Sequence, residues 1–391
     1  MRKINATDTV IVSSKRSAIG KYGGALRDWP MREWASQILR SAVDASSLTP
    51  ETIEHVVTGR CFATDNRHIA LDAGIPTHAI STGVYMACAS GMMAVQQADR
   101  LVKLGEADAI IAGGLEHMSA VPYLSHATRW GARFGSTELE DQLKTGLSCL
   151  SCGLQMGQTA ENIRRKHNIS RQEQDEYAQW SQEKAAAAIS AGRFKEEITP
   201  LEVPQGRGKT LTFETDEYPR LSSVQKLSEL KAAFEKDGTV TAGNASGLND
   251  AAAFLVLTSG AYAEANGLTP LARIVAGASS GIDPSIMGLG PVISLQRVLK
   301  KAGLTPDAID LYEINEAFAV QVLGVVREFP IAREKLNVNG GAVALGHPVG
   351  CSGARIIVTL IHELRRRGLQ YGAASLCVGG GMGCATIIEA L

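Results

Sequence analysis

The chain has almost no excess of either charge and no hydrophobic run long enough to cross a membrane. Its 391 residues include 39 Lys and Arg against 40 Asp and Glu, a formal net charge of −1. This balance argues against nucleic acid or an anionic membrane as the main partner. No apolar segment reaches the ~20 residues of a spanning helix, and neither terminus reads as a secretory signal or a lipid anchor. We therefore expect no membrane partner.

The cysteines are few and show no disulfide framework. An odd count of seven in a large chain without a secretory signal favours reduced thiols and a cytoplasmic location. Cys149 and Cys152 have CxxC spacing, but a zinc site needs about four ligands and no second pair at suitable spacing is visible. We therefore predict no metal site, and we expect no redox role for this pair.

Strand patterns alternate with helical ones toward both ends of the chain. The predicted strands are 8–14, 54–59, 270–279, 309–315 and 373–381, and the predicted helices are Arg32–Asp44 and Val292–Ala302. This alternation indicates an α/β architecture with a largely buried sheet. The length suggests two or three lobes rather than one simple core.

Two segments far apart in the chain follow the same plan. Residues 88–91, Cys-Ala-Ser-Gly, open a predicted helix that ends at Gly105, and residues 351–353, Cys-Ser-Gly, open one that ends at Gly368. Each helix leads into a strand that we expect to end in glycines; the first is Ala109–Ala112, followed by Gly113 and Gly114. The repeated unit predicts a duplicated fold.

The middle of the chain differs from both ends in its pattern of predicted elements. Ser170 and Glu173 form a capping box before a long polar-faced helix that ends at Gly192. An irregular charged stretch, 204–223, follows it. We interpret this middle region as an inserted lobe over the duplicated core, and such lobes often bind substrate or cofactor.

Cys88 stands at the start of a predicted helix, where backbone N–H groups are unpaired and the helix dipole favours negative charge. In such a place the pKa of a thiol can fall from about 8.5 toward roughly 3.5–7.5, and the cysteine becomes a nucleophile. The alternative is a small buried apolar side chain.

Four other stretches join a predicted strand end to glycines and a reactive or amide side chain. They are 241–253, 313–319, 340–355 and 375–385. His347 could act as a general base for a thiol, and Asn315 could orient water. Cys377 precedes glycines whose N–H groups could form an anion-binding nest. Each has a plainer alternative: a capping histidine, a packed cysteine or a tight turn.

Taken together, these motifs resemble those of the thiolases along nearly the whole chain. The resemblance rests on CASGMMAV from Cys88, TAGNASGLNDAAA, NEAFA, GGAVALGHPVGCSGAR and CVGGGMG from Cys377. It implies a duplicated five-layered α/β/α/β/α fold, with residues 1–119 and 246–269 as the first half, 120–245 as an inserted loop domain that binds coenzyme A, and 270–391 as the second half. It also implies acyl-coenzyme A substrates, dimers or tetramers, and no cofactor beyond the coenzyme A of substrate and product.

The resemblance assigns a role to each reactive residue. Cys88 is similar to the nucleophile that accepts the acyl group, and His347 to the base that activates it. Cys377 is similar to the acid/base that handles the proton at the α-carbon. One thioester oxygen would be held by His347 and, through a water, by Asn315. The N–H groups of Cys88 and Gly379 would form the oxyanion hole for the other.

Further residues match positions around the acyl-CoA substrate. They are Leu147, Gln155, Met156, Arg220, Ala245, Ser246, Met287 and Phe318. Within this set, the resemblance places Ser246 beside the pantetheine chain and Arg220 near the nucleotide phosphates.

The chain departs from the family pattern close to the acyl-binding region. Tyr85 replaces an asparagine, Gln155 replaces the histidine usual in short-chain members, and the Cys149/Cys152 segment replaces one that commonly carries an aspartate. Met287, by contrast, matches the short-chain pattern. The leading hypothesis is an acetyl-CoA C-acetyltransferase, and the near alternative is a broader 3-ketoacyl-CoA thiolase.

Two more distant alternatives also remain. A synthase that uses an acyl carrier protein would generally carry a third histidine where this chain has Cys377. A non-catalytic acyl-CoA binding protein of the same fold would not need the intact set of Cys88, His347 and Cys377.

Overall fold

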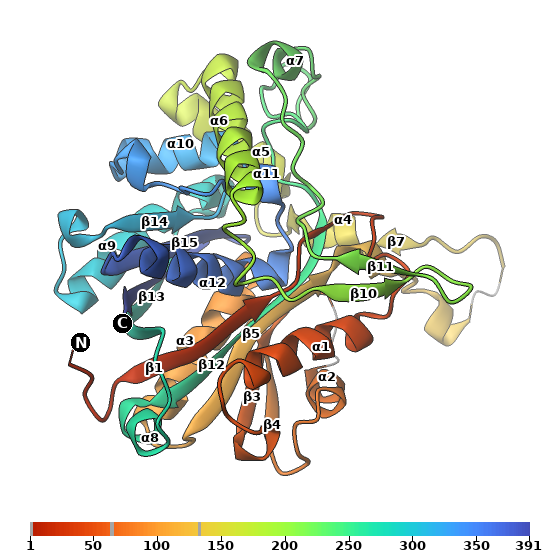
Figure 1. The fold of residues 1–391 in the computed structure, drawn as a ribbon. Coiled ribbons are helices and arrows are strands. Elements are labelled where there is room, and N and C mark those ends of the chain that lie inside the picture. The colour runs from red at the N-terminus through yellow and green to blue at the C-terminus, as the bar shows by residue number, and fades with distance from the viewer. Residues whose placement is uncertain (1–2, 63–65, 132–133) are drawn as a thin grey trace.

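A computed structural model describes residues 3–62, 66–131 and 134–391 (Figure 1). Its main sheet has ten strands, in the order β14-β15-β16-β13-β1-β12-β5-β3-β4, with β2 beside β12. The strands are β1 Thr9–Arg16, β2 Gly20–Lys21, β3 His55–Gly59, β4 Ile80–Val84, β5 Ala109–His117, β12 Asn249–Ser259, β13 Ala272–Gly281, β14 Leu311–Ile314, β15 Tyr371–Val378 and β16 Met382–Ala390. The first and second halves meet where β1 pairs with β13 through Val10 and Ile11.

The helices form layers between and outside the two halves of this sheet. The central helices α3 (Ser90–Lys103) and α12 (Val349–Arg367) pack against each other and against strands of both halves. Helices α1 (Met31–Asp44) and α2 (Asn66–Asp72) cover the outer face of the first half, and α9 (Gly290–Ala302) covers the second (Figure 1). The predicted α/β/α/β/α order is therefore confirmed.

Glycines let the two central helices approach closely. A Cβ on Gly91 of α3 would lie 2.8 Å from the Gly350 carbonyl oxygen, and one on Gly353 of α12 would lie 2.4 Å from the Met92 nitrogen. Real Cβ atoms cannot come so near to backbone, so the openings Cys-Ala-Ser-Gly and Cys-Ser-Gly both end in glycine for packing reasons. The contact explains part of the sequence repeat.

The predicted end of the first repeat strand is wrong. Strand β5 does not stop at Gly113 but continues to His117, because β12 pairs with it up to Asp250. A Cβ on Gly114 would lie 2.2 Å from the Gly350 carbonyl oxygen. These glycines therefore do not end the strand. They leave space for the start of α12, which packs against the continuous strand.

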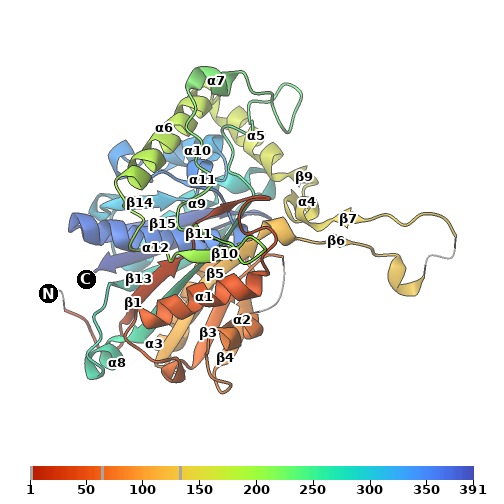
Figure 2. The same cartoon turned by 45° about the vertical axis from the view of Figure 1, so that its right-hand side comes forward.

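The region between β5 and β12 contributes small elements and two long helices. They are β6 Tyr123–Leu124, β7 Glu140–Asp141, α4 Gln142–Gly146, β8 Ser148–Cys149, β9 Leu154–Gln155, α5 Met156–His167, α6 Arg171–Ser190, β10 Leu201–Pro204, β11 Thr210–Phe213 and α7 Val224–Ser228. The capping box is confirmed, since Ser170 Oγ accepts the Glu173 N–H and Glu173 Oε2 accepts the Ser170 N–H. Figure 2 shows β6 and β7 on an arm that reaches away from the sheets.

Three further helices complete the second half and its junctions. They are α8 Gly260–Ala265, α10 Ala319–Glu328 and α11 Ala342–Leu345. Helix α10 packs against α5 and α6, and α11 packs against α6, so the middle region lies directly on the second half. None of the helices in the described ranges is long and apolar enough to cross a membrane.

Candidate active site

Cys88 lies in a tight turn immediately before a central helix. The 3-10 turn Ala87–Ala89 precedes α3, and Ala87 has a φ of 42°, in the left-handed region. The Ser90 hydroxyl donates to the Ala87 carbonyl oxygen (2.7 Å) and accepts the Met86 N–H (2.9 Å). Strain of this kind persists only where the surroundings hold it, and here it presents the Cys88 thiol to a cavity.

The Cys88 sulfur receives two backbone N–H groups, its own and that of Gly379. Burial nevertheless outweighs these donors and raises the pKa of the thiol to about 11. The prediction of a lowered pKa is therefore wrong for the free protein, because the apolar surroundings of the helix start disfavour the charged thiolate more than the N–H donors favour it. Cys88 rests as a neutral thiol, and its activation requires a base.

His347 is suited to be that base. It is buried, and burial, assisted by the Arg355 charge, lowers its pKa to about 4, so the imidazole is neutral at neutral pH. Its Nδ1 lies 2.6 Å from the Ser352 hydroxyl, which donates to the Pro348 carbonyl oxygen at 2.9 Å. The hydroxyl can thus accept an N–H from Nδ1.

This bond leaves the other ring nitrogen of His347 as the basic one. Nε2 is buried and has no hydrogen-bond partner among the described residues. The backbone is fixed as well, since Asn249 Oδ1 accepts the His347 N–H at 2.9 Å. His347 therefore presents a bare, oriented lone pair in the cavity that it shares with Cys88.

Cys377 is the second thiol of the site. It is fully buried near the end of β15, and burial together with the nearby Cys88 holds its pKa well above the usual range. Gly380 and Gly381 follow with φ values of 86° and 84°, in the region that favours glycine. Cys377 is thus a protonated thiol that can deliver a proton, and a strong base once it has done so.

Asn315 lies at the junction of β14 and α10, beside the histidine. Its Nδ2 is 3.5 Å from His347 Nδ1, and its Oδ1 is buried without a hydrogen-bond partner in the part of the chain that the structure describes. An unsatisfied buried amide oxygen is costly. It fits a group that meets water or substrate.

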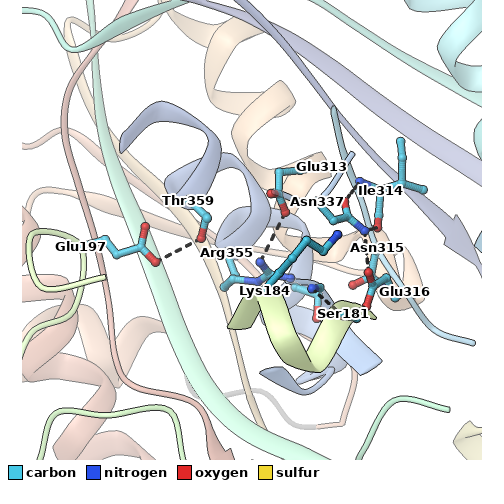
Figure 3. A network of polar contacts seen from close by, with 12 residues as sticks. Ser181, Lys184, Glu197, Glu313, Ile314, Asn315, Glu316, Asn337, Arg355 and Thr359 are labelled. Carbon is cyan, nitrogen blue, oxygen red and sulfur yellow. Dashed lines mark hydrogen bonds and ion pairs between the residues drawn. The ribbon is translucent and has the colours of Figure 1, made fainter. Parts of the chain in front are cut away.

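A network of buried polar groups fixes the loop that carries Asn315 (Figure 3). The Glu316 carboxylate accepts hydrogen bonds from the Ser181 hydroxyl (2.7 Å), the Tyr177 hydroxyl (2.9 Å) and Asn337 Nδ2 (2.8 Å). Tyr177 and Ser181 belong to α6, so the middle region of the chain holds this part of the site in place.

Cys88 and His347 open onto a cavity of about 240 Å³, whereas Cys377 and Asn315 are not part of its lining. Its lining is mostly apolar and comprises Cys88, Met118, Lys144, Leu147, Ser148, Gln155, Met156, Gly157, Phe234, Ala245, Ser246, Gly247, Leu248, Met287, Ala317, Phe318, His347 and Val349. Seven of the eight predicted substrate-binding residues are in this set; Arg220 is not. The structure therefore brings together residues that are far apart in the sequence.

Arg220 lies on the surface outside this cavity. It is exposed, its guanidinium packs over the Tyr218 ring at 4.5 Å, and it donates to the Ala242 carbonyl oxygen.

Cys149 and Cys152 do not line the cavity either, although their neighbour Gln155 does. The thiols therefore do not widen the acyl cavity directly.

Several residues that support the site were missed from the sequence. Ser352 and Asn249 lie inside the GGAVALGHPVGCSGAR and TAGNASGLNDAAA motifs, and their hydrogen-bonding side chains are a signal that the sequence offers. Nothing in the sequence points to Glu116. Its buried carboxylate accepts the N–H groups of Gly350 (2.9 Å) and Cys61 (3.0 Å). Phe234 lies in an irregular stretch and is found only through the fold.

The comparisons with known proteins agree along the whole chain. Residues 9–261 match the thiolase N-terminal domain, and residues 268–390 match the thiolase C-terminal domain. An acetyl-CoA acetyltransferase of Cupriavidus necator is 45% identical over 98% of this chain and 99% of its own. The human mitochondrial 3-ketoacyl-CoA thiolase is 42% identical over 97% of each chain.

Solved structures give the same result. The crystal structure of the Bacillus anthracis acetyl-CoA acetyltransferase superposes with a TM-score of 0.96 at 45% identity, over 98% of this chain and 99% of that one. The human mitochondrial 3-ketoacyl-CoA thiolase in complex with CoA gives 0.95 at 41% identity over 100% of both chains. The chain therefore belongs to the thiolase family.

Proposed function

We propose that the protein is an acetyl-CoA C-acetyltransferase, which joins two acetyl-CoA molecules reversibly into acetoacetyl-CoA and CoA. The observation that carries this proposal is that the Cys88 thiol and the unpartnered Nε2 of His347 line one cavity, with the buried thiol of Cys377 near Cys88. A carbon–carbon bond next to a thioester needs a nucleophile and two separate proton-handling groups. The reaction needs no cofactor beyond the coenzyme A of its substrate and product.

In the first half-reaction, Cys88 takes an acetyl group. His347 Nε2 accepts the thiol proton as the sulfur attacks the carbonyl carbon, and the same proton then goes to the departing CoA sulfur. The N–H groups of Cys88 and Gly379, which already point at the sulfur, are placed to receive the oxyanion. Because both Cys88 and His347 rest neutral, no charge is buried until the bond forms.

In the second half-reaction, Cys377 handles the proton of the other acetyl-CoA. In the cleavage direction its thiol protonates the carbanion released from acetoacetyl-CoA and then regains a proton from the protonated His347. In the condensation direction Cys377 first passes its proton to the neutral His347, its thiolate removes the α-proton, and His347 then protonates the departing Cys88 sulfur. The raised pKa of Cys377 suits both tasks, since the thiol is protonated at rest and its thiolate is strongly basic. Asn315 and His347 would hold the oxygen of the enolate.

A broader chain-length preference is the second candidate, and Gln155 is the observation that favours it. Its side chain is exposed at the cavity, where it would restrict a longer acyl chain less than an imidazole. Met287 and Phe318 oppose this effect, since both are buried walls of the same cavity. The related proteins carry both names, acetyl-CoA acetyltransferase and 3-ketoacyl-CoA thiolase, at similar identity.

Thiolysis kinetics test the proposal and separate the two candidates. The protein should cleave acetoacetyl-CoA with CoA, and kcat/KM should fall in graded steps for longer 3-ketoacyl-CoA substrates, because one methylene is worth only about 1–3 kcal/mol. Gln155→His should steepen this fall. No cleavage of any 3-ketoacyl-CoA would contradict the function, and an unchanged length profile in Gln155→His would remove Gln155 as its determinant.

The protein is also proposed to act as a homo-oligomer in the cytoplasm. Strand β4 is an edge strand with exposed residues, including Ile80, and the β6–β7 arm exposes Trp130 (88%) and Phe134. Unpaired edges and exposed aromatic groups favour association. Light scattering should give a multiple of 41.4 kDa; a monomer would contradict the assignment.

The proposed cytoplasmic location rests on the seven free cysteines.

A further inference from the structure

Cys149 and Cys152 lie in a small hairpin beside the active site. Strands β8 and β9 pair Ser148 with Gln155 and Cys149 with Leu154, so the two cysteines share one tight turn. The Gly153 N–H donates to the Cys149 carbonyl oxygen at 2.8 Å, which closes this turn. A turn of this size brings residues three positions apart to within about 7 Å at their Cα atoms, near the range that a disulfide spans.

The two thiols contact each other and the oxyanion-hole loop. The Cys152 thiol donates to the Cys149 sulfur, and that sulfur also accepts the N–H of Gly380. Gly380 follows Gly379, whose N–H points at the Cys88 sulfur. Cys149 is buried and Cys152 is half-buried, so the pair can be reached from outside while it touches the catalytic loop.

From these contacts we propose that Cys149 and Cys152 form a thiol–disulfide exchange site that reacts with small-molecule disulfides and, when oxidised, slows catalysis through the Gly379–Gly381 loop. This is the role that the CxxC spacing alone did not favour. The effect on catalysis rests on the proposed function, whereas the formation of the disulfide does not.

The chemistry is a two-electron exchange with the incoming disulfide. Burial opposes ionisation of Cys149, but the Cys152 N–H and thiol and the Gly380 N–H together lower its pKa, so Cys149 is the attacking thiolate. It bonds to one sulfur of the small disulfide and expels the other as a thiolate. Cys152 then loses its proton and attacks the Cys149 sulfur, which releases the second small thiol. The pair is oxidised, and one disulfide is reduced to two thiols.

The disulfide would act on the site in a direct way. Formation of the S–S bond turns the Cys149 sulfur toward Cys152, and a disulfide sulfur is a weak acceptor, so its contact with the Gly380 N–H is weakened. The adjacent Gly379 N–H is a donor of the oxyanion hole, and removing such a donor outright costs about 10²–10³ in kcat. A displaced loop should cost less, and we expect a roughly tenfold lower kcat in the oxidised enzyme.

Peptide mapping tests the site without reference to activity. The full-length protein is equilibrated with mixtures of oxidised and reduced glutathione, alkylated and cut with trypsin. The peptide 145–164 contains both cysteines and no others. With rising oxidised glutathione it should lose both alkyl groups together and be two hydrogens lighter than the unlabelled dithiol peptide, and excess dithiothreitol should restore both labels. Two alkyl labels throughout, or glutathione adducts alone, would overturn the proposal.

The matched variant Cys149→Ser, which lacks the attacking thiol but keeps an oxygen that can accept the Gly380 N–H, separates this site from oxidation of Cys88. In the reduced state it should have wild-type kcat, and oxidised glutathione should not lower that kcat under conditions that slow the wild type about tenfold. Equal inhibition of variant and wild type would overturn the proposed effect on catalysis. A disulfide that forms in a protein with no thiolase activity would contradict the proposed function and leave the exchange site standing.

Discussion

The two central helices have similar residues at their start, Cys-Ala-Ser-Gly and Cys-Ser-Gly, yet the proposed nucleophile belongs to only one of these openings. Cys88 precedes α3 in a strained turn, and its sulfur meets two N–H groups at a cavity. Cys351 lies inside α12, its N–H donates to the Pro348 carbonyl oxygen (2.9 Å), its side chain is fully buried, and burial raises its pKa to about 12. The position of a cysteine relative to the helix start and to the cavity decides its chemistry.

In the proposed mechanism, the second half contributes the proton-handling groups instead. His347 lies just before α12, and Cys377 lies near the end of β15, so the proposed reaction is divided between the two halves of the fold. The serines of the two openings differ in the same way. Ser90 fixes the strained turn before Cys88, whereas Ser352 orients the ring of His347.

The largest effect should come from Cys88→Ala. We expect kcat to fall by about 10⁴-fold or more, because no other residue supplies the nucleophile. Steady-state cleavage of acetoacetyl-CoA measures this loss, and thermal unfolding shows whether the variant is folded. A folded variant that keeps more than a hundredth of the wild-type rate would contradict the assignment.

Cys377→Ala should separate the two half-reactions. Cleavage and formation of the carbon–carbon bond should fall by about 10³-fold, since general acid–base groups contribute ~10²–10⁴. Exchange of labelled CoA with acetyl-CoA should persist, because this exchange removes no proton from the α-carbon and so does not need Cys377. The matched control is Cys384→Ala, which removes another fully buried thiol from the adjacent strand β16. Equal loss of both half-reactions in Cys377→Ala would mean that its role is misassigned.

The paired variants Ser352→Ala and Ser90→Ala should differ in their pH profiles. Wild-type kcat/KM should fall only as the pH drops through about 4, because below that pKa His347 is protonated and cannot act as a base. Ser352→Ala removes the acceptor that also stabilises the imidazolium, so this acidic limb should move to lower pH. A rate loss of about tenfold should accompany it, equivalent to one hydrogen bond of about 1.4 kcal/mol.

Ser90→Ala should instead loosen the turn before Cys88. We expect a lower kcat and a free energy of unfolding lower by about 1 kcal/mol, with the acidic limb unmoved. An acidic limb that moves equally in both variants would show that the two serines do not have the separate roles assigned to them.

The smallest effect should come from Cys351→Ala. We expect wild-type kcat and KM, with a free energy of unfolding lower by about 1–2 kcal/mol because a buried sulfur is lost from a packed helix. Kinetics and denaturant unfolding of the same preparation check both parts. A large loss of kcat at unchanged stability would erase the contrast between the two helix openings.

Much of this organisation could be predicted from the sequence, since it depends on local patterns. The alternating strands and helices, the capping box at Ser170 and the repeated helix openings are visible without tertiary information. The residue types around Cys88, His347 and Cys377 also indicated one site. Their assignment to a known family rested on resemblance rather than on spacing.

The remaining features depend on neighbours that the sequence does not reveal. Strand β5 continues past Gly113 because β12 pairs with it, and the glycines serve the approach of α12. The pKa of Cys88 rises because burial outweighs its N–H donors. The contact of Cys149 with Gly380 joins residues more than two hundred positions apart. Each of these is a tertiary effect.

The most direct test of the central claim is the position of the acetyl group on the enzyme. The full-length protein is incubated with acetyl-CoA, quenched in acid and cut with trypsin, which places Cys88 in peptide 68–100 and Cys351 in peptide 336–355, each as the sole cysteine. We predict an acetyl group on Cys88 and none on Cys351. Acetylation of Cys351 in the wild type would contradict the account. So would an acetyl group on any other residue of the Cys88→Ala variant.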